Sequence, residues 1–331
     1  MNPRAPSIPV EALHRLLHEP KGTPLPADQA QALRAAGCEL APVDAAEGLH
    51  RLVRSGLGAW EDYLAWRCPL PGSRPRTIRV FNRTSSTQDV ARALAIAPGD
   101  HADGALVIAD EQTHGRGRLG RRWTAPPGAG LLFTRVRLDG ASTGGGPAGD
   151  APLTLAASVA CAEAIDGLLP PGAGPVRIKW PNDLTVGGRK LAGLLVESTP
   201  LGAGGSARAW LLGVGLNTGL RQEDLPADAG ELASRVTSLS MLGADVDRLR
   251  VLAELVRAID AAAARPAAEL CEAWRSRATL PPSRCTVWHD GAELRGEVID
   301  IDPLAGLIFR RESGEILHLP AATTTIMPQS P

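Results

Sequence analysis

The sequence predicts an α+β fold, and two observations support that prediction. Two long helical segments, at 153–169 and 245–264, are separated by groups of consecutive strand-like segments rather than by single strands. From about 281 to 331, short strand-like segments follow one another with turn residues between them. We therefore expect no strict βαβ alternation, and we expect a small β-barrel at the end of the chain.

The composition is that of a globular protein of about two domains. Hydrophobic residues make up 44% and charged residues 21% of the 331 residues, which excludes disordered, collagen-like and disulfide-stapled chains. No apolar run approaches the roughly 18 residues of a membrane helix, so we expect no membrane association. The first residues lack the apolar core of a signal peptide, which predicts a cytoplasmic protein. A net charge of −1 argues against a dedicated nucleic-acid binder.

The cysteines, histidines and lysines narrow the chemistry further. The five cysteines form no CxxC pair and the seven histidines have no metal-ligand spacing, so we expect buried thiols, no disulfide framework and no metal bound by the protein. Only three of the 35 basic residues are lysines, namely Lys21, Lys179 and Lys190. A lysine kept in such an arginine-rich chain marks a place where a compact ammonium is needed, and two of the three lie close together.

Turn residues and apolar spacing divide the chain into parts. Helix-type spacing occurs at 12–19 and 27–37, and a hairpin is expected within 38–53. Basic residues in 1–70 number seven and acidic residues eight, so this part lacks the basic face of a DNA reader. The predicted parts are a helical unit (1–70), a linker (68–75), a main domain (76–265) and a β-barrel domain (281–331).

Within the main domain, apolar runs predict strands, the longest helices lie at 153–169 and 245–264, and another helix begins at about 85. The Gly-rich stretch 140–152 is too polar to pack and indicates a surface loop. The expected strands are 77–83, 105–110, one within 128–140, 176–180, 190–198 and 207–217.

A glycine- and arginine-rich segment, Gly115–Trp123, is the strongest local signal. Its glycines let the backbone approach a ligand closely, and its arginines supply donors that match phosphate or carboxylate. No GxxxxGK[ST] pattern is present, which excludes a P-loop. An anion-binding loop is one interpretation, and a basic surface loop or an RGG-like RNA contact is the other.

Four further segments have both a chemical and a purely structural interpretation. The loop Lys179–Leu184 follows a strand and offers Lys, Asn and Asp, but Pro-Asn-Asp is also ordinary turn chemistry. The ammonium of Lys190 either faces a phosphate or sits at a charged hairpin tip. Two glycines in the apolar strand 213–217 predict close approach by a ligand or by another backbone. Ser86, three residues before Asp89, predicts a helix cap that can coexist with ligand contact.

Taken in order, these five segments resemble the biotin protein ligases. The residues are SSTQD from Ser85, DEQTHGRGRLGRRW from Asp110, IKWPNDL from Ile178, GGRKLAGLLVE from Gly187 and GVGLN from Gly213. The resemblance covers about 78–265 and implies a central mixed-sheet catalytic domain like that of class II synthetases. The C-terminal strands resemble the family's small SH3-like barrel. The helical unit 1–70 is only weakly similar to the winged helix of repressor-type ligases, so it is a small helical unit or a degenerate winged helix.

The resemblance implies a two-step reaction. Biotin and ATP, with Mg²⁺ bridging ATP oxygens, give biotinyl-5′-AMP and pyrophosphate, and biotin then passes to one lysine of a biotin carboxyl carrier protein or domain. Both steps move negative charge around a phosphoryl group, so positioning and electrostatics should dominate catalysis. Asp183 matches the carboxylate that accepts a proton from the incoming amine. We expect a nearby Lys179 to keep Asp183 ionised.

By residue, the implied assignments overlap. The catalytic set is Lys190, Arg118, Asp183 and Lys179. The biotin-binding set is Ser86, Thr87, Gln88, Gln112, Gly115, Arg116, Gly117, Arg118, Lys190 and Gly193. The ATP and adenylate set is Arg116, Arg118, Arg121, Trp123, Asn182, Lys190 and Asn217.

Two other functions remain open at this point. One is a biotin-responsive repressor that also has ligase activity, although the charge balance of 1–70 makes DNA binding unexpected. The other is a lipoate or octanoate transferase of the same fold, which would need an apolar acyl tunnel. Gln88 stands where repressor-type ligases often have Asn, which affects one detail of the ureido contact. The sequence leaves open whether the chain is a monomer or a homodimer.

Overall fold

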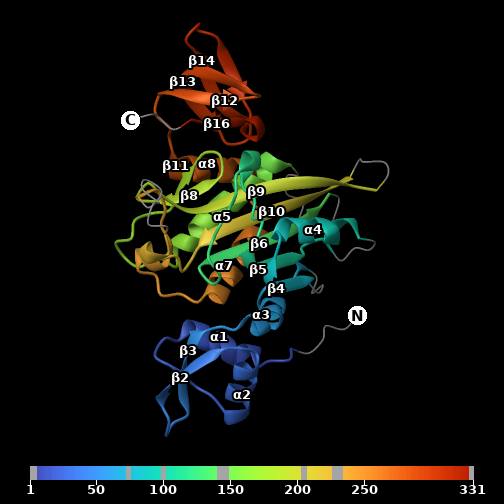
Figure 1. Cartoon of the computed structure of the whole chain (residues 1–331), viewed down its shortest axis with the longest axis vertical. Helices are drawn as coiled ribbons and strands as arrows, with labels where there is room; N and C mark the ends of the chain where they lie inside the picture. Colours follow the sequence, from blue (N-terminus) through green and yellow to red (C-terminus); the bar gives the residue numbers. More distant parts are fainter. Residues whose placement is uncertain are drawn as a thin grey trace.

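The protein is described by a computed structural model that covers residues 6–71, 76–97, 102–139, 149–202, 207–225 and 234–327. Within these ranges, three sheets of three, eight and five strands follow one another along the chain. Figure 1 shows them stacked along the long axis, with the largest sheet between the two smaller ones. We call the three parts the N-terminal unit (6–71), the central unit (76–279) and the C-terminal unit (284–327).

The N-terminal unit has the two helices and the hairpin that the sequence predicts. It also has a third helix, Trp60–Arg67, that the sequence analysis missed. The segment WEDYLAWR lacks a clear apolar stripe, yet Trp60, Tyr63 and Leu64 are buried, so tertiary packing stabilises this helix. The elements are α1 (Val10–His18), β1 (Thr23–Pro24), α2 (Ala27–Ala35), β2 (Glu39–Asp44), β3 (Leu49–Arg54) and α3 (Trp60–Arg67), with sheet order β1-β3-β2.

The central unit is a mixed sheet with strand order β11-β7-β8-β9-β10-β6-β5-β4. The pairs β4–β5 and β11–β7 are parallel and the other pairs are antiparallel, which confirms the α+β class. The strands are β4 (Ile78–Thr84), β5 (Leu106–Gln112), β6 (Gly130–Leu138), β7 (Arg177–Lys179), β8 (Asp183–Val186), β9 (Arg189–Leu201), β10 (Ala207–Asn217) and β11 (Ala278–Thr279).

Helices cover both faces of this sheet. Helix α4 (Thr87–Ile96) lies on the face of Gly213, whereas α5 (Asp150–Asp166) and α7 (Arg248–Ala262) lie on the face of Leu212. Neighbouring strand residues point to opposite faces, so the two sets of helices lie on opposite sides. A further helix, α8 (Ala267–Arg277), packs on α5 and was not predicted. On the face of Gly213, α4 covers only part of the sheet, and the candidate site lies beside it.

Two predicted loops lie partly outside the described residues. Of the Gly-rich stretch, residues 140–148 are not described, and of the linker, residues 72–75 are not described. In the described part of the linker, Cys68 and Leu70 are buried in the protein. Four of the five cysteines are buried as predicted, and Cys271 is half-buried. Among the described ranges, no helix combines the length and apolar character that crossing a bilayer requires.

The C-terminal unit is a five-stranded antiparallel sheet with strand order β15-β14-β13-β12-β16. A bulge between Val298 and Asp300 bends its longest strand. The predicted small β domain is present. Within residues 284–327, however, no ladder joins the short edge strands β15 and β16, so the expected closure into a barrel is not seen. The strands are β12 (Arg284–His289), β13 (Ala292–Asp302), β14 (Gly306–Arg311), β15 (Ile316–Leu319) and β16 (Thr324–Ile326).

Candidate active site

The glycine- and arginine-rich segment forms a hairpin, which we call the Gly-Arg hairpin (Gly115–Trp123). Its base is closed by the amide of Trp123, which donates to the carbonyl of Gly115 at 3.0 Å. Nearer the tip, the amide of Gly117 donates to the carbonyl of Arg121 at 2.7 Å. The turn places Leu119 at a φ of 54°, a conformation that few residues other than glycine adopt. The hairpin follows β5, so its arginines extend from the end of a buried strand.

At the base of the hairpin, the Trp123 ring lies against two glycines of the central sheet. A Cβ on Gly215 of β10 would lie 2.5 Å from Trp123 Cε2, and one on Gly193 of β9 would lie 3.1 Å from Cζ3. Only glycine at these positions admits the ring. The 213–217 glycines do admit a close approach, but by side chains rather than by the ligand or backbone that the sequence predicted: Trp123 lies at Gly215 and Gln88 at Gly213.

Lys190 and Asp183 form an ion pair beside this ring. Lys190 Nζ lies 2.7 Å from Asp183 Oδ1 and 5.3 Å from the centroid of the Trp123 ring. A Cβ on Gly193 would lie 3.4 Å from Nζ and 3.5 Å from Oδ1, so the glycine leaves room for the pair. The side chains of Lys190 and Asp183 are 37% and 25% exposed, which keeps the pair accessible to a substrate.

The structure changes the partner that the sequence analysis gave to Asp183. Lys179 is the strand partner of Asp183 across β7 and β8, but its side chain is exposed and the ion pair of Asp183 is with Lys190. A register shift after Leu184 between β8 and β9 accompanies the approach of Lys190. The sequence predicted a loop over Lys179–Leu184. The structure confines the turn to residues 180–182, because Lys179 ends β7 and Asp183 begins β8.

A polar cluster joins the start of α4 to the end of β5. Ser86 caps α4 by accepting a hydrogen bond from the amide of Gln88 at 3.3 Å, so the helix cap that the sequence predicted at Ser86 is present. The amide and the hydroxyl of Thr87 donate to Gln112 Oε1 at 2.7 and 3.1 Å. Thr134 donates to the Thr87 hydroxyl at 2.8 Å. The structure thus brings together Ser86, Thr87 and Gln112, which the sequence had assigned to one pocket.

The side chain of Gln88, from α4, lies on strands β9 and β10 next to this cluster. Its Nε2 donates to the carbonyls of Leu195 and Leu211 at 3.1 and 3.3 Å, and a Cβ on Gly213 would lie 2.8 Å from it. Its Oε1 is buried, and no hydrogen-bond partner for it occurs among the described residues. A buried acceptor without a partner is costly, so this oxygen is available for an N–H donor of a ligand.

Arg116 is held by two carboxylates that the sequence analysis did not assign to the site. It forms ion pairs with Asp89 at the start of α4 and with Glu197 of β9, the latter at 3.6 Å. Arg92 also contacts Glu197, at 3.0 Å. Asp89 had been interpreted as part of a helix cap. Glu197 was detectable only through strand alternation, because it lies four residues after Gly193 and therefore on the same face.

At the tip of the hairpin, Arg118 reaches the C-terminal unit. Its Nη2 donates to the backbone carbonyl of Ala321 and, at 3.3 Å, to that of Thr324. Arg118 and Ala321 line one side of a cleft of about 190 Å³, and Asn182 of the β7–β8 turn and Thr154 of α5 line it from the central unit. Arg121 is exposed at the other side of the tip. The hairpin thus crosses the site from the end of β5 to the C-terminal unit.

The two asparagines assigned to the adenine side both donate to backbone carbonyls. Asn217 Nδ2 donates to the carbonyl of Thr237 at 3.0 Å, and the amide of Thr237 donates to the carbonyl of Lys190 at 2.9 Å. Asn182 Nδ2 donates to the carbonyl of Leu194. Thr237 therefore connects Lys190 and Asn217 through its backbone. Nothing in the sequence pattern indicated this contact.

Comparison with known proteins places this site in a family. The model of the "Biotin/lipoate A/B protein ligase family" matches residues 80–217. A biotin--[acetyl-CoA-carboxylase] ligase of Mycobacterium tuberculosis is 32% identical over 270 residues, covering 75% of this chain and 91% of that protein. The chain belongs to the biotin protein ligase family.

Two other members show how far the likeness extends. The bifunctional ligase/repressor BirA of Escherichia coli is 38% identical over 166 residues, which are 50% of this chain and 47% of that protein. The chain thus spans about half the length of the BirA relatives that it matches. The biotin protein ligase from Aquifex aeolicus in complex with biotin and ATP has a TM-score of 0.57 at 22% identity, covering 76% of this chain and 99% of that one. This structural likeness concerns the fold.

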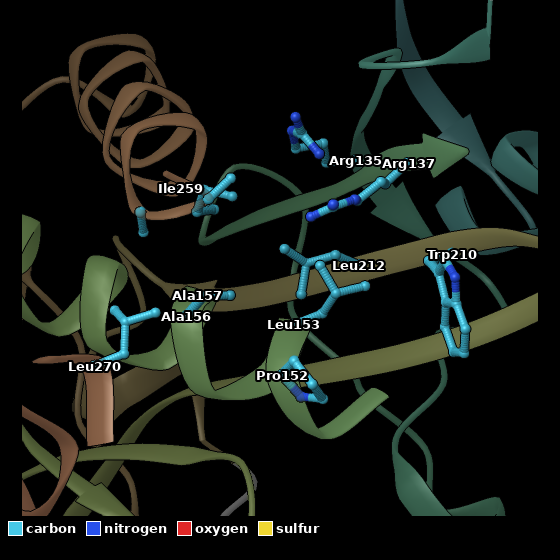
Figure 2. Close-up of a pocket in the computed structure, with 12 residues that line it drawn as sticks. Arg135, Arg137, Pro152, Leu153, Ala156, Ala157, Trp210, Leu212, Ile259 and Leu270 are labelled. Atoms are coloured by element: carbon cyan, nitrogen blue, oxygen red, sulfur yellow. The ribbon is translucent and has the colours of Figure 1, made fainter. Parts of the chain in front are cut away.

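A second, smaller cavity lies between the central sheet and the helices α5 and α7. It has a volume of about 20 Å³, and Arg135 of β6, Leu212 of β10 and Ile259 of α7 line it. Figure 2 shows these side chains converging between the strands and the helices. None of the residues that the sequence assigned to a ligase site lines this cavity. The chemistry of the family is therefore sought on the face that carries the Gly-Arg hairpin.

Proposed function

We propose that this protein is a biotin protein ligase that activates biotin with MgATP and transfers it to a lysine of a biotin carboxyl carrier protein or domain. The observation that supports this most strongly is the Lys190–Asp183 pair, 2.7 Å apart beside Trp123 and below a hairpin of arginines. An ammonium, a carboxylate and an aromatic face then lie together next to a polar pocket. Family membership supports the same activity.

In the first step, a carboxylate oxygen of biotin attacks the α-phosphorus of ATP and the bond to pyrophosphate breaks. Negative charge develops on the phosphoryl oxygens, and the ammonium of Lys190 stabilises it. Arg116, Arg118 and Arg121 of the hairpin supply further cations and cover the phosphates. Each arginine donates several fixed N–H groups, which suits phosphate oxygens.

The ureido end of biotin is proposed to lie against the polar cluster near α4. There Gln88 Oε1 accepts an N–H of the ureido ring, because this oxygen is buried and has no protein partner among the described residues. Ser86, Thr87 and Gln112 are the neighbouring polar groups. The glycines Gly115, Gly117 and Gly193 keep the backbone close to the ligand.

The adenine side is proposed to involve Trp123, Asn182 and Asn217. Trp123 offers an aromatic face, and its Nε1 is buried with no partner among the described residues. Mg²⁺ would come with ATP and would neutralise phosphate charge, which usually needs few protein ligands. In the ranges that the structure describes, no three His, Cys, Asp or Glu side chains gather into a metal site.

In the second step, the carrier lysine amine attacks the mixed anhydride of biotinyl-5′-AMP. A C–N bond forms, the C–O bond breaks and AMP leaves. Asp183 accepts the proton that the amine loses. Lys179 is opposite Asp183 in the sheet and exposed, so we propose that it meets the incoming substrates at the mouth of the site.

The experiment incubates the full chain with MgATP, biotin and a biotin carboxyl carrier domain. We expect a mass gain of one biotin on one carrier lysine, and biotin-dependent pyrophosphate exchange without the carrier. Parallel reactions contain lipoate or octanoate. Labelling by lipoate or octanoate and not by biotin would replace this proposal with an acyl transferase.

A variant separates the two half-reactions. Asp183→Asn should slow transfer more than adenylate synthesis, so that biotinyl-5′-AMP accumulates, and higher pH should partly restore transfer because more carrier amine is free. The matched control is Asp224→Asn, an exposed carboxylate outside the site. Equal loss of both half-reactions would instead give Asp183 the role of holding Lys190.

The flanking units have proposed assignments of their own. The order α1-β1-α2-β2-β3, with one helix between β1 and β2, supports a degenerate winged helix for 1–70. Because basic residues do not outnumber acidic ones in this part, we propose that the protein acts as an enzyme and does not regulate transcription. We propose that 76–265 is the catalytic domain and that 281–331 is a variant of the SH3-like barrel. The ligase would meet its carrier in the cytoplasm, as a monomer or a homodimer.

A further inference from the structure

A turn of the C-terminal unit contacts the tip of the Gly-Arg hairpin. This turn runs from Ala321 through Thr323 into β16, and the carbonyls of Ala321 and Thr324 accept hydrogen bonds from Arg118. Arg118 and Ala321 lie more than 200 residues apart in the sequence. The conformation of a short turn in the C-terminal unit therefore helps to set the place of Arg118 at the edge of the cleft.

One side chain, together with the backbone pairing of β12 and β16, fixes this turn. His289, the last residue of β12, hydrogen-bonds through Nδ1 to the hydroxyl of Thr324 at 2.9 Å and to that of Thr323 at 3.3 Å. His289 is also the strand partner of Thr324. Thr324 is fully buried, so its hydroxyl depends on a protein partner. The imidazole ring thus holds both hydroxyl-bearing residues of the turn that receives Arg118.

We infer that His289 is a positioning residue for Arg118 and that it keeps the Gly-Arg hairpin over the cleft. It touches neither the proposed substrates nor the hairpin, and it acts through Thr323 and Thr324. The β12–β16 ladder and the amide of Asp290, which donates to the carbonyl of Thr323 at 3.4 Å, also hold this turn. Without the Nδ1 contact the two hydroxyls lose their partner, the carbonyls that receive Arg118 are held less firmly and the hairpin tip opens more often. This inference rests on the proposed function for its catalytic consequence only.

The chemistry of histidine offers matched variants. The amide of Asn reaches the place of Nδ1, whereas the amide of Gln reaches the place of Nε2, which lies 3.2 Å from Asp290 Oδ2. His289→Asn keeps a partner for Thr324 and His289→Gln does not. Thr324→Val removes the hydroxyl from the other side of the same contact. All three variants leave the Gly-Arg hairpin and the Lys190–Asp183 pair untouched.

The first experiment measures the hairpin itself, without substrates. Trypsin cuts after arginine, and the hairpin contains Arg116, Arg118, Arg121 and Arg122. We expect His289→Gln and Thr324→Val to be cut within the hairpin roughly tenfold faster than the wild type, the effect of losing about one hydrogen bond. His289→Asn should be cut at the wild-type rate.

Mass spectrometry of the fragments separates a local from a global effect. An opened hairpin raises cleavage between 116 and 122 only, whereas a destabilised fold raises cleavage at arginines throughout the chain. Equal hairpin cleavage in the Gln, Asn and wild-type proteins would overturn the inference. A rise at all arginines together would overturn it as well, because His289 would then only stabilise the fold.

The second experiment measures release of biotinyl-5′-AMP without a carrier. His289→Gln should release it several-fold faster than His289→Asn while forming it at a similar rate. Unchanged release with faster hairpin cleavage would overturn the catalytic consequence of the contact. If the wild type forms no biotinyl-5′-AMP, the proposed function fails, and the trypsin result still decides whether His289 holds the hairpin.

Discussion

The N-terminal and C-terminal units flank the central sheet at opposite ends of the molecule (Figure 1). Buried residues of both flanking units belong to one apolar core with the central unit. The N-terminal unit contacts helices and strand ends of the central unit. The C-terminal unit in addition contacts the Gly-Arg hairpin, which crosses the candidate site. Variants at this hairpin contact should therefore fail in a different way from variants that break the N-terminal attachment to the scaffold.

The N-terminal attachment is a closed polar network around the start of α7. Asp247 caps this helix by accepting from the amide of Leu249 at 2.8 Å, and it also accepts from the amide and hydroxyl of Ser55 at 2.7 and 2.6 Å. The indole of Trp60 donates to the Ser55 hydroxyl at 3.1 Å. Breaking this network should uncap a central helix as well as loosen the N-terminal unit.

Arg248 extends the network into the central sheet. Its guanidinium lies 5.4 Å from the Trp60 ring centroid and 2.5 Å from Asp110 of β5, and it donates to the carbonyl of Gly130 at 3.2 Å. Gly130 is the strand partner of Asn217 at the start of β6. The network therefore ends on strand backbones near the site without contacting the Lys190–Asp183 pair.

The largest effect should follow from opening the N-terminal side. Trp60→Ala removes a side chain that is 1% exposed, and we expect it to lower the free energy of unfolding by about 3–5 kcal/mol. Urea denaturation measures this. The matched control is Trp66→Ala in the same helix, which is 40% exposed and should cost less than about 1 kcal/mol. Equal losses for the two variants would contradict a shared core across the units.

Lys190→Arg tests the site between the two flanking units. The guanidinium is broader than the ammonium that fits beside Gly193 and Asp183, so we expect adenylate formation to fall on the order of 10²-fold at unchanged stability. Pyrophosphate exchange measures the rate. Lys21→Arg, on the exposed surface of the N-terminal unit, is the matched control. Near-normal pyrophosphate exchange by the Lys190 variant would show that Lys190 has no catalytic role and is only a charged residue at a hairpin tip.

Arg118→Gly removes the contact with the C-terminal unit. We expect biotinyl-5′-AMP to escape about tenfold faster without a carrier, because the hairpin no longer stays over the cleft. The melting temperature should remain that of the wild type, in contrast to the Trp60 variant. Arg122→Gly in the same hairpin, where the exposed Arg122 contacts the carbonyl of Thr113, is the matched control. Equal escape from both variants would assign the effect to general loosening of the hairpin.

The sequence predicted those elements whose own residues determine them. The strand at 105–110 and the helix at 153–169 could be predicted because elements that are buried on most sides consist of long apolar runs. Helix α3 could not be predicted from the sequence, since contacts with β4 and α7 stabilise it and its own residues show no apolar periodicity. Strand β8 was not predicted, because it begins at Asp183 and Pro181-Asn182-Asp183 is typical of a turn.

The candidate site shows the same limit. Motifs identified Lys190, Asp183, Arg116 and Arg118 individually, but their partners depend on the fold. The Lys190–Asp183 pair lies beside a register shift between β8 and β9, and Arg116 pairs with Glu197 only because β9 passes under the hairpin. No local pattern connects Arg118 to a turn near residue 321, since that contact joins two units of the chain.

The smallest expected effect is an acid sensitivity confined to the N-terminal unit. Burial lowers the pKa of His14, with His18 and Arg67 adding to the effect. Its Nδ1 also lies 3.0 Å from the Tyr63 hydroxyl, whose pKa burial raises to about 12. The charged and titratable groups that influence His14 are His18 on its own helix, Arg67 on α3, and Glu254 and Arg250 on α7.

The sign follows from the direction of this shift. A histidine whose pKa is lower in the folded than in the unfolded protein contributes its stability above the unfolded value of about 6.5, and that stability is lost as the pH falls through the folded value. Between pH 7.5 and pH 5 the wild type should therefore lose on the order of 1 °C more in melting temperature than His14→Gln, which keeps a polar partner for Tyr63. His318→Gln, on the exposed surface of the C-terminal unit, should behave as the wild type. A larger change from the His318 variant would place the acid-sensitive group in the C-terminal unit and reverse the comparison.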